Sequence, residues 1–177
     1  MECPEICFIG RSNVGKSSMI NKLLAQRIAR TSSTPGATQV INLYEVLYEH
    51  GRQRQRIIFS DFPGFGYSKV SKKIYRGWEA MIENYINANK LIKRLIWVYD
   101  VRRKIDETDN MLIDWMSDNN LDFTLVLTKI DKVSRNDVYA KRLIFEKLFG
   151  DGRVFVFSSK DGYGRIELLS HIVSKTV

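Results

Sequence analysis

Residues Gly10–Ser17 read Gly-Arg-Ser-Asn-Val-Gly-Lys-Ser and match the pattern G-x-x-x-x-G-K-[ST] at every defined position. The stretch lies between an apolar run and a segment of helical periodicity, which is the context that the pattern requires. Its glycines let successive backbone N–H groups and the following helix N-terminus meet phosphate oxygens. An accidental glycine-rich turn would explain the pattern but not its placement, so we predict a phosphate-binding loop. This loop is expected to comprise Gly10, Arg11, Ser12, Asn13, Val14, Gly15, Lys16, Ser17 and Ser18.

Apolar runs of strand length alternate with helical segments along the whole chain, which is typical of a parallel sheet covered by helices. The connection at His50-Gly51 is too short for a helical crossover, so the second and third strands should form an antiparallel hairpin. We predict an α/β fold with a six-stranded, mostly parallel sheet, one antiparallel edge strand and helices on both faces. The expected strands are Glu5–Ile9, Val40–Tyr48, Arg56–Ser60, Leu95–Tyr99, Phe123–Leu127 and Val154–Phe157.

Helical periodicity predicts which side chains face the core. One core-facing stripe runs from Trp78 to Ile86, and Ser134–Asp137 has the spacing of a capping box that opens a later helix. Stretches 27–39 and 62–73 lack a pattern and are predicted to be loops. The other apolar positions of the helices are Met19, Ile20, Leu23 and Leu24; Met111, Leu112, Trp115 and Met116; Val138, Leu143 and Leu148; and Ile166, Leu169, Ile172 and Val173.

Length and composition favour one globular domain over residues 1–177. Hydrophobic residues make up 44% of the chain and charged residues 27%, which excludes disordered and collagen-like classes. The net charge of +8 favours an anionic partner. Cys3 and Cys7 give no disulfide framework, and no apolar stretch approaches the roughly 18 residues of a membrane span, so a cytoplasmic location is expected.

A second candidate for phosphate chemistry is Asp61, which follows an apolar strand in the sequence Asp61-Phe62-Pro63-Gly64. A carboxylate at this place can hold magnesium, usually through water, while Ser17 supplies a hydroxyl ligand and Lys16 adds charge at the outer phosphates. The Gly64 N–H can contact a γ-phosphate. Alone, these residues would also suit a solvated turn.

The sequence Thr128-Lys129-Ile130-Asp131 closes another predicted strand. The Asp131 carboxylate can accept two hydrogen bonds from guanine, and the Lys129 stem can lie along the base. Adenine offers no matching donor pair, which argues against an ATP-dependent kinase. A helix cap is the ordinary alternative for such an Asp. A loop that closes over the base is predicted after the last strand, at Phe157, Ser158, Ser159 and Lys160.

A hydroxyl from the loop before the second strand should complete magnesium coordination when a γ-phosphate is present. We select Thr38 because Gly36 supplies flexible backbone just before it, while Thr31 and Thr34 remain alternatives. The part of this loop expected at the nucleotide is Gly36, Ala37, Thr38, Gln39 and Val40.

Taken together, these motifs resemble those of the translational-type GTPases. The sequences of three segments are similar to those of the EngB family of ribosome-assembly GTPases: Gly10–Ser18, Arg30–Gln39 and Gly64–Lys72. The similarity covers nearly the whole chain from about Pro4. It implies GTP and Mg²⁺ as ligands, slow hydrolysis, and a switch of the loops around Thr38 and residues 61–73. It also implies a role in assembly of the large ribosomal subunit, with ribosomal RNA and proteins as partners, a link to cell division, no DNA partner and a monomer. A GTP-dependent scaffold at the division site is the alternative function.

The family resemblance also assigns catalytic roles, which fall on Lys16, Thr38, Gly64 and Asn13. Signalling GTPases place a water-orienting Gln after the glycine of the Asp61 motif, but this chain has Phe65, so hydrolysis should be slow. Asn13 resembles the Asn that coordinates potassium in related GTPases, although Asn also suits such turns.

The chain also differs from the family pattern at three points. Phe62 and Phe65 replace the family's usual residues, and the family usually carries a further segment before the first strand, so a truncated or misassigned start is a hypothesis. Basic side chains follow two strands at the expected nucleotide edge and are candidates for contacts with RNA, or else an ordinary solvated surface. These are Lys69, Lys72, Lys73 and Arg76, and Arg102, Arg103 and Lys104.

Overall fold

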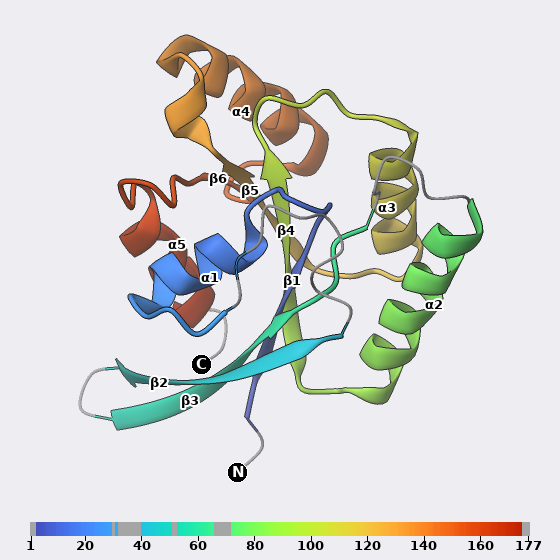
Figure 1. The fold of residues 1–177 in the computed structure, drawn as a ribbon, viewed down its shortest axis with the longest axis vertical. Coiled ribbons are helices and arrows are strands. Elements are labelled where there is room, and N and C mark those ends of the chain that lie inside the picture. Colours follow the sequence, from blue (N-terminus) through green and yellow to red (C-terminus); the bar gives the residue numbers. More distant parts are fainter. Residues whose placement is uncertain (1–2, 30, 32–39, 51–52, 66–71, 175–177) are drawn as a thin grey trace.

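The computed structural model describes residues 3–29, 31, 40–50, 53–65 and 72–174 (Figure 1). In this part of the chain, strands and helices alternate as the sequence predicts. The strands are β1 (Glu5–Ile9), β2 (Asn42–His50), β3 (Gln53–Asp61), β4 (Ile92–Asp100), β5 (Phe123–Thr128) and β6 (Val154–Val156). The helices are α1 (Lys16–Leu24), α2 (Lys72–Ala88), α3 (Glu107–Asp118), the 3₁₀ turn η1 (Ile130–Lys132), α4 (Arg135–Phe149) and α5 (Arg165–Ser174).

The six strands form one sheet in the order β2-β3-β1-β4-β5-β6. All neighbouring pairs are parallel except β2 and β3, which pair antiparallel from Asn42 opposite Asp61 to His50 opposite Gln53. The predicted hairpin and the reversed edge strand are therefore confirmed. Figure 1 shows this hairpin extending beyond the rest of the sheet.

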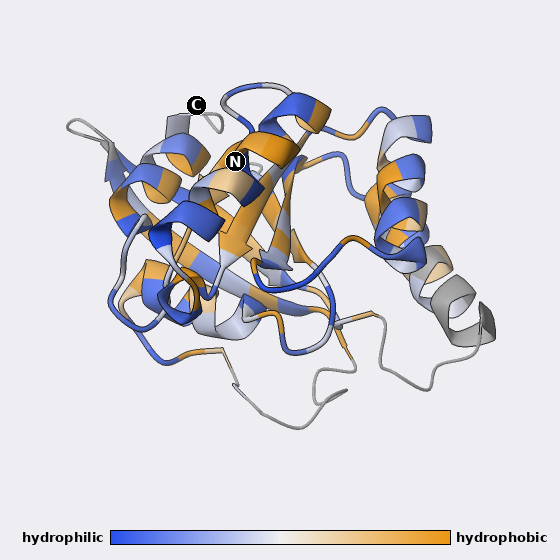
Figure 2. Ribbon diagram, turned by 90° about the horizontal axis from the view of Figure 1, so that it is seen from above, coloured by the Kyte–Doolittle hydropathy of each residue, from blue (hydrophilic) through white to orange (hydrophobic). Residues whose placement is uncertain are grey.

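Helices cover both faces of the sheet. On one face, α1 and α5 pack against the side chains of Ile6, Phe8, Ile96 and Val98. On the other, α2, α3 and α4 pack against the alternate residues of the same strands, such as Trp97. Because the central strands are buried on both faces, they are continuous apolar runs, which is usual for parallel strands. Figure 2 shows these hydrophobic residues gathered between the helices.

Two predicted helix faces need correction. In α4, Phe145 is fully buried, while Leu143 and Leu148 are exposed. In α5, Leu168 and Ile172 face the core, and Ile166 is 77% exposed. The helical spacing is present in both segments, but several stripes are compatible with it, and only the position of the sheet selects one.

Several predicted boundaries also shift. The strands β3 and β4 each begin three residues earlier than predicted, α2 begins at Lys72 within the stretch predicted to be a loop, and Val40 precedes β2 rather than opening it. The predicted cap of α4 is present: the Ser134 hydroxyl accepts the Asp137 N–H at 3.2 Å. Met111 is exposed at the edge of the α3 face that buries Leu112, Trp115 and Met116.

The parallel strands bring four chain segments to one edge of the sheet. The carboxyl ends of β1, β3, β4 and β5 lie side by side, so the residues that follow Ile9, Asp61, Asp100 and Thr128 meet there. Ligands of open α/β sheets bind at this edge. None of the helices in the described part of the chain has the length and hydropathy needed to cross a bilayer.

Candidate nucleotide site

The predicted phosphate loop turns sharply after β1 and leads into α1. Gly10 has a φ of +152°, and a Cβ at this position would lie 2.4 Å from the Val98 carbonyl oxygen. Only glycine fits such a close approach to the neighbouring strand. Gly15 is the N-cap of α1 and offers no side-chain cap, so the first N–H groups of this helix face the loop. A helix N-terminus of this kind is a site for anions.

Lys16 is the first residue of α1 and only 7% of it is exposed. Its Nζ donates to the carbonyl oxygens of Gly10 at 3.2 Å and Arg11 at 3.3 Å. Burial lowers the pKa of this ammonium group to about 8, although the Asp61 carboxylate acts in the opposite direction. The chain therefore holds a poorly solvated positive charge inside the predicted phosphate loop.

Ser17 and Asp61 meet across 44 residues of sequence. The Ser17 hydroxyl donates to Asp61 Oδ2 at 2.6 Å, and Asp61 is 1% exposed. Its other oxygen, Oδ1, is buried and makes no hydrogen bond within the described residues. Burial raises the pKa of Asp61, whereas the hydroxyl and the Lys16 charge lower it.

This pair suits a magnesium ion. A hydroxyl, a carboxylate and water are the oxygen ligands that Mg²⁺ takes beside substrate phosphates, and the unused Oδ1 supplies the acceptor. In the described ranges, no three or more His, Cys, Asp or Glu side chains are placed so that they could hold a metal ion together. The residues fit a metal that is shared with a phosphate ligand.

The segment after β3 is fastened to the phosphate loop. The Ser12 N–H donates to the Phe65 carbonyl at 3.0 Å, and a Cβ at Gly64 would lie 2.7 Å from the Ser12 backbone. Phe62 and Phe65 are buried, and the Phe65 ring packs 4.6 Å from that of Trp78. Phe65 is thus a core anchor, and Trp78 is a core residue as predicted.

The predicted base-recognition loop is tied to the phosphate loop by two contacts. The Thr128 hydroxyl donates to the Val14 carbonyl at 2.6 Å. Lys129, which has a left-handed φ of 59°, donates from Nζ to the Asn13 carbonyl at 2.5 Å. The Lys129 stem therefore bridges the two loops.

Asp131 presents a carboxylate with spare capacity to accept hydrogen bonds. Its side chain is 12% exposed, and its nearest cation is Lys132 Nζ at 3.5 Å from Oδ2. Oδ2 makes no hydrogen bond within the described residues, and Oδ1 accepts only a long one from the Ser158 hydroxyl at 3.3 Å. A base that offers two N–H donors would satisfy it.

The loop of Phe157–Lys160 is held by a residue that the sequence analysis missed. Arg165, the first residue of α5, donates to the Lys22 carbonyl from Nε at 2.8 Å and to the Leu23 carbonyl from Nη2 at 2.8 Å. In addition, Lys22 donates a hydrogen bond from Nζ to the Lys160 carbonyl at 3.4 Å. These contacts hold the base loop against the end of α1. No local sequence pattern predicts them, because the partners lie far apart in the chain.

The basic residues predicted at this edge are partly neutralised. Arg102 pairs with Asp100 at 2.7 Å, and Arg103 pairs with Asp109 at 2.9 Å. Burial raises the pKa of Asp100, but the hydrogen bonds from Arg102 and Lys129 outweigh this and lower it to about 2. Both arginines do lie near the site, yet neither offers an uncompensated charge to RNA.

Arg11 of the phosphate loop also makes an ion pair, at 2.7 Å from Asp106, the N-cap of α3. Asp100 and Asp106 were not singled out from the sequence. The position of Asp100 after a buried strand was the available signal.

Several predicted residues lie outside the described part of the chain. This holds for Thr34, Gly36, Ala37, Thr38 and Gln39, for Lys69, and for the side chains of Lys72, Lys73 and Arg76. Thr31 and Val40 are exposed. Asn13 has a left-handed φ of 62° and an exposed side chain.

Comparison with known proteins agrees with this arrangement. A family model described as a 50S ribosome-binding GTPase matches residues 5–129. A probable GTP-binding protein EngB of Desulfatibacillum aliphaticivorans is 41% identical over 175 residues, which cover 97% of this chain and 82% of the relative. Another, of Aquifex aeolicus, is 34% identical over 172 residues, which cover 97% of this chain and 90% of the relative.

Solved structures share the fold. The crystal structure of a probable GTP-binding protein EngB superposes with a TM-score of 0.69 at 21% identity and covers 97% of this chain and 98% of that one. Era of Aquifex aeolicus bound to GDP and AlF4⁻ gives a TM-score of 0.79 at 22% identity. That match covers 99% of this chain but only 57% of the Era chain.

Replacing Lys16 with Met tests the buried charge. Because the pKa in the folded protein, about 8, lies below the unfolded value of 10.5, folding penalises the ammonium form. The penalty is complete below about pH 8 and disappears as the pH rises toward 10.5. We expect Lys16→Met to raise the free energy of unfolding of the nucleotide-free protein at pH 7 by roughly 1–3 kcal/mol, less at higher pH.

Urea denaturation at pH 7 and near pH 10 measures this difference. Lys147→Met is the matched control, because Lys147 is exposed on α4 and its replacement should change stability by less than about 0.5 kcal/mol. Added GDP should stabilise the wild type and not Lys16→Met. An unfolding free energy that falls in Lys16→Met equally at both pH values would contradict the argument.

Proposed function

The chain belongs to the EngB family of GTP-binding proteins, and from this membership we propose that it is a magnesium-dependent switch in assembly of the large ribosomal subunit. As a member of a GTPase family, it hydrolyses GTP to GDP and phosphate. We also propose that Mg²⁺ binds with the nucleotide and that the large ribosomal subunit is the partner. A link to cell division and the action of residues 1–177 as one domain belong to the same proposal.

One observation carries the proposal: a phosphate end and a base end meet at one edge of the sheet. Lys16 and the Ser17–Asp61 pair form the first, and Asp131 beside Ser158 forms the second. Lys129 bridges them. A guanine nucleotide satisfies both ends at once, because its phosphates meet the α1 N-terminus while its ring N–H and amine meet Asp131.

In the proposed reaction, water attacks the γ-phosphorus, the bond from that phosphorus to the bridging oxygen of GDP breaks, and the water protons pass to phosphate and solvent. Lys16 binds the outer phosphates, Ser17 and, through water, Asp61 hold Mg²⁺, and Gly64 contributes its N–H to the γ-phosphate. Bound Mg²⁺ neutralises charge that develops on the phosphate oxygens. Thr38 is proposed as the further ligand in the GTP state.

Slow hydrolysis follows from the place of Phe65. Its ring is packed into the core against Trp78, and a phenyl group donates no hydrogen bond to an attacking water. The water must therefore be oriented by groups other than the residue after Gly64, which limits the rate of the isolated protein.

Asp131→Asn tests base recognition. The Asn amide donates where the carboxylate accepted, so it opposes the guanine amine and suits the keto group of xanthine. We expect GTP affinity to fall by at least about 100-fold and xanthosine triphosphate to be preferred. Equilibrium binding of fluorescent GTP and XTP analogues measures this. Asp151→Asn, at an exposed turn, is the control; wild-type protein that binds ATP and GTP equally would overturn the assignment.

Potassium is proposed to bind beside Asn13 and to stabilise negative charge in the transition state. We expect hydrolysis to be about tenfold faster in potassium than in sodium at equal ionic strength. The left-handed backbone at Asn13 makes Asn13→Gly the better test variant, because Gly keeps this φ without strain while removing the amide. Equal rates in the two salts, or an Asn13→Gly variant that keeps the potassium response, would contradict the proposal.

Ribosomal binding should depend on the nucleotide, because GTP and GDP hold the loops around the γ-phosphate differently. We expect large-subunit particles to co-sediment with the protein bound to a non-hydrolysable GTP analogue, and at least about tenfold less with GDP. Small-subunit particles are the control. Equal sedimentation in both states would overturn the proposed switch and leave the division-site scaffold as the better hypothesis.

A further inference from the structure

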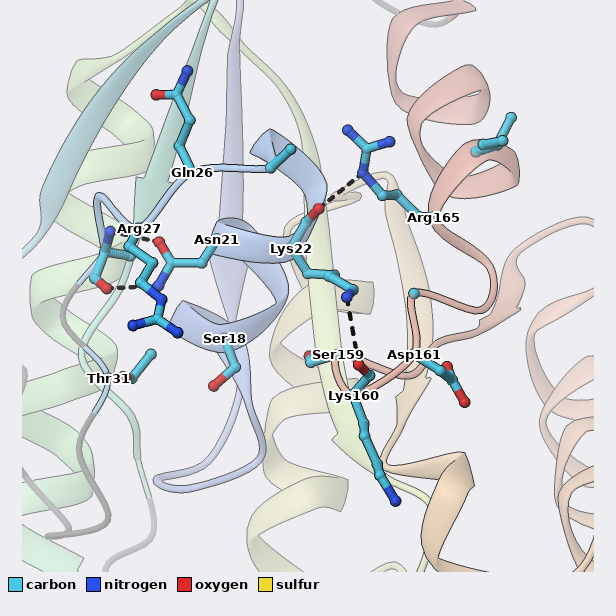
Figure 3. Close-up of a pocket in the computed structure, with 14 residues that line it drawn as sticks. Ser18, Asn21, Lys22, Gln26, Arg27, Thr31, Ser159, Lys160, Asp161 and Arg165 are labelled. Carbon is cyan, nitrogen blue, oxygen red and sulfur yellow. Dashed lines mark hydrogen bonds between the residues drawn. The ribbon is translucent and has the colours of Figure 1, made fainter.

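A wide, open groove of about 1130 Å³ lies beside the nucleotide loops, between α1 and the start of α5 (Figure 3). Ser18, Asn21 and Lys22 on α1 form its floor, as Figure 3 shows. Arg27 flanks it on one side, and Lys160 and Arg165 flank it on the other. The groove borders the nucleotide loops at Ser18, Ser159 and Lys160, whereas its part around Gln26 and Arg27 has no role in the nucleotide chemistry proposed above.

The groove is strongly positive. Lys22, Arg27, Lys160 and Arg165 line it, and Asp161 is its one carboxylate. Within the described ranges, none of the four cations forms an ion pair, in contrast to Arg11, Arg102 and Arg103 at the neighbouring edge. Lys22 and Arg165 donate only to carbonyl oxygens, which satisfy their N–H groups without cancelling their charge.

The groove extends beyond the reach of a bound guanine nucleotide. Phosphates are expected at the N-terminus of α1, whereas Lys22 lies six residues after Lys16, or roughly 9 Å along the helix axis. Arg27 lies beyond the C-terminal end of this helix. The volume of the groove also exceeds that of most pockets for single small molecules, which are about 300–1000 Å³.

Separated positive charges in an open groove fit a polymer with regularly spaced anions. RNA has this character, and its sugar hydroxyls can pair with an uncharged polar group of the groove such as Gln26. We propose that the groove between α1 and α5 binds the phosphodiester backbone of RNA. This inference rests on the proposed ribosomal function, since ribosomal particles present RNA to the protein.

The variant Arg27→Gln removes one charge from the groove, keeps a hydrogen-bond donor at this position and leaves the clamp of Lys22 and Arg165 on the base loop intact. Lys93→Gln is the matched control, because this lysine is exposed near the start of β4, at the opposite edge of the sheet. The full-length protein is loaded with a GTP analogue. The probe is a fluorescent single-stranded RNA of about 16 nucleotides, titrated over a salt series.

We expect the groove variant to lose at least about threefold in RNA affinity, and its salt slope to fall by roughly 0.7. The control should change affinity by less than about twofold. Both variants should bind GDP as the wild type does, which separates the groove from the nucleotide site. Equal losses in the two variants, or an unchanged groove variant, would overturn the proposal, as would a groove variant that loses GDP affinity.

Sedimentation distinguishes failure of the groove from failure of the proposed function. If wild-type protein binds large-subunit particles and the groove variant binds them equally well, only the groove proposal is wrong. If wild-type protein binds no particle in either nucleotide state, the proposed function is wrong. Binding to vesicles rich in phosphatidylglycerol that needs Arg27, without RNA binding, would replace RNA by a lipid surface and overturn the proposal.

Discussion

Burial of Lys16 and Asp61 at the carboxyl edge of the sheet is the constraint on which the rest of the site depends. Taking a charged group out of water costs free energy unless partners compensate for it. Here the compensation is incomplete: Lys16 contacts carbonyl oxygens, and Asp61 keeps one oxygen without a hydrogen bond among the described residues. A phosphate and a metal ion would supply the missing charges, which is why this edge fits the nucleotide and magnesium proposed for it.

The same electrostatic reasoning separates two kinds of basic residue. Arg102 and Arg103 looked equivalent to other surface cations in the sequence, but Asp100 and Asp109 neutralise them and turn them into supports for the loops. Lys22 and Arg165 have carbonyl partners and stay positively charged. A cation therefore indicates an anionic partner only after its own neighbours have been identified, which requires the fold.

Sequence motifs and spacing correctly predicted the structural features that they encode directly. The turn of residues 10–15 between β1 and α1, the hairpin, the Ser134 cap and the approach of Ser17 to Asp61 followed from motif, spacing and strand order. Contacts between distant segments did not: Arg165 reaches α1 from 142 residues away. The outward Leu143 and Ile166 show a further limit, since hydrophobic spacing leaves the buried stripe of a helix undetermined. The loop with Thr38 lies outside the described residues, so its role stays a prediction.

Helix α1 links the nucleotide site with the groove because its two ends have opposite electrostatic preferences. The backbone dipoles favour an anion at the N-terminus, where Gly15 leaves N–H groups for phosphate, and a cation at the C-terminus, where the Arg165 guanidinium caps the last carbonyls. Arg165 also begins the helix that follows the base loop of Ser158 and Lys160. The phosphate loop, the base loop and the groove thus contact one short helix, so a nucleotide at its N-terminus and RNA in the groove would be held by the same rigid element.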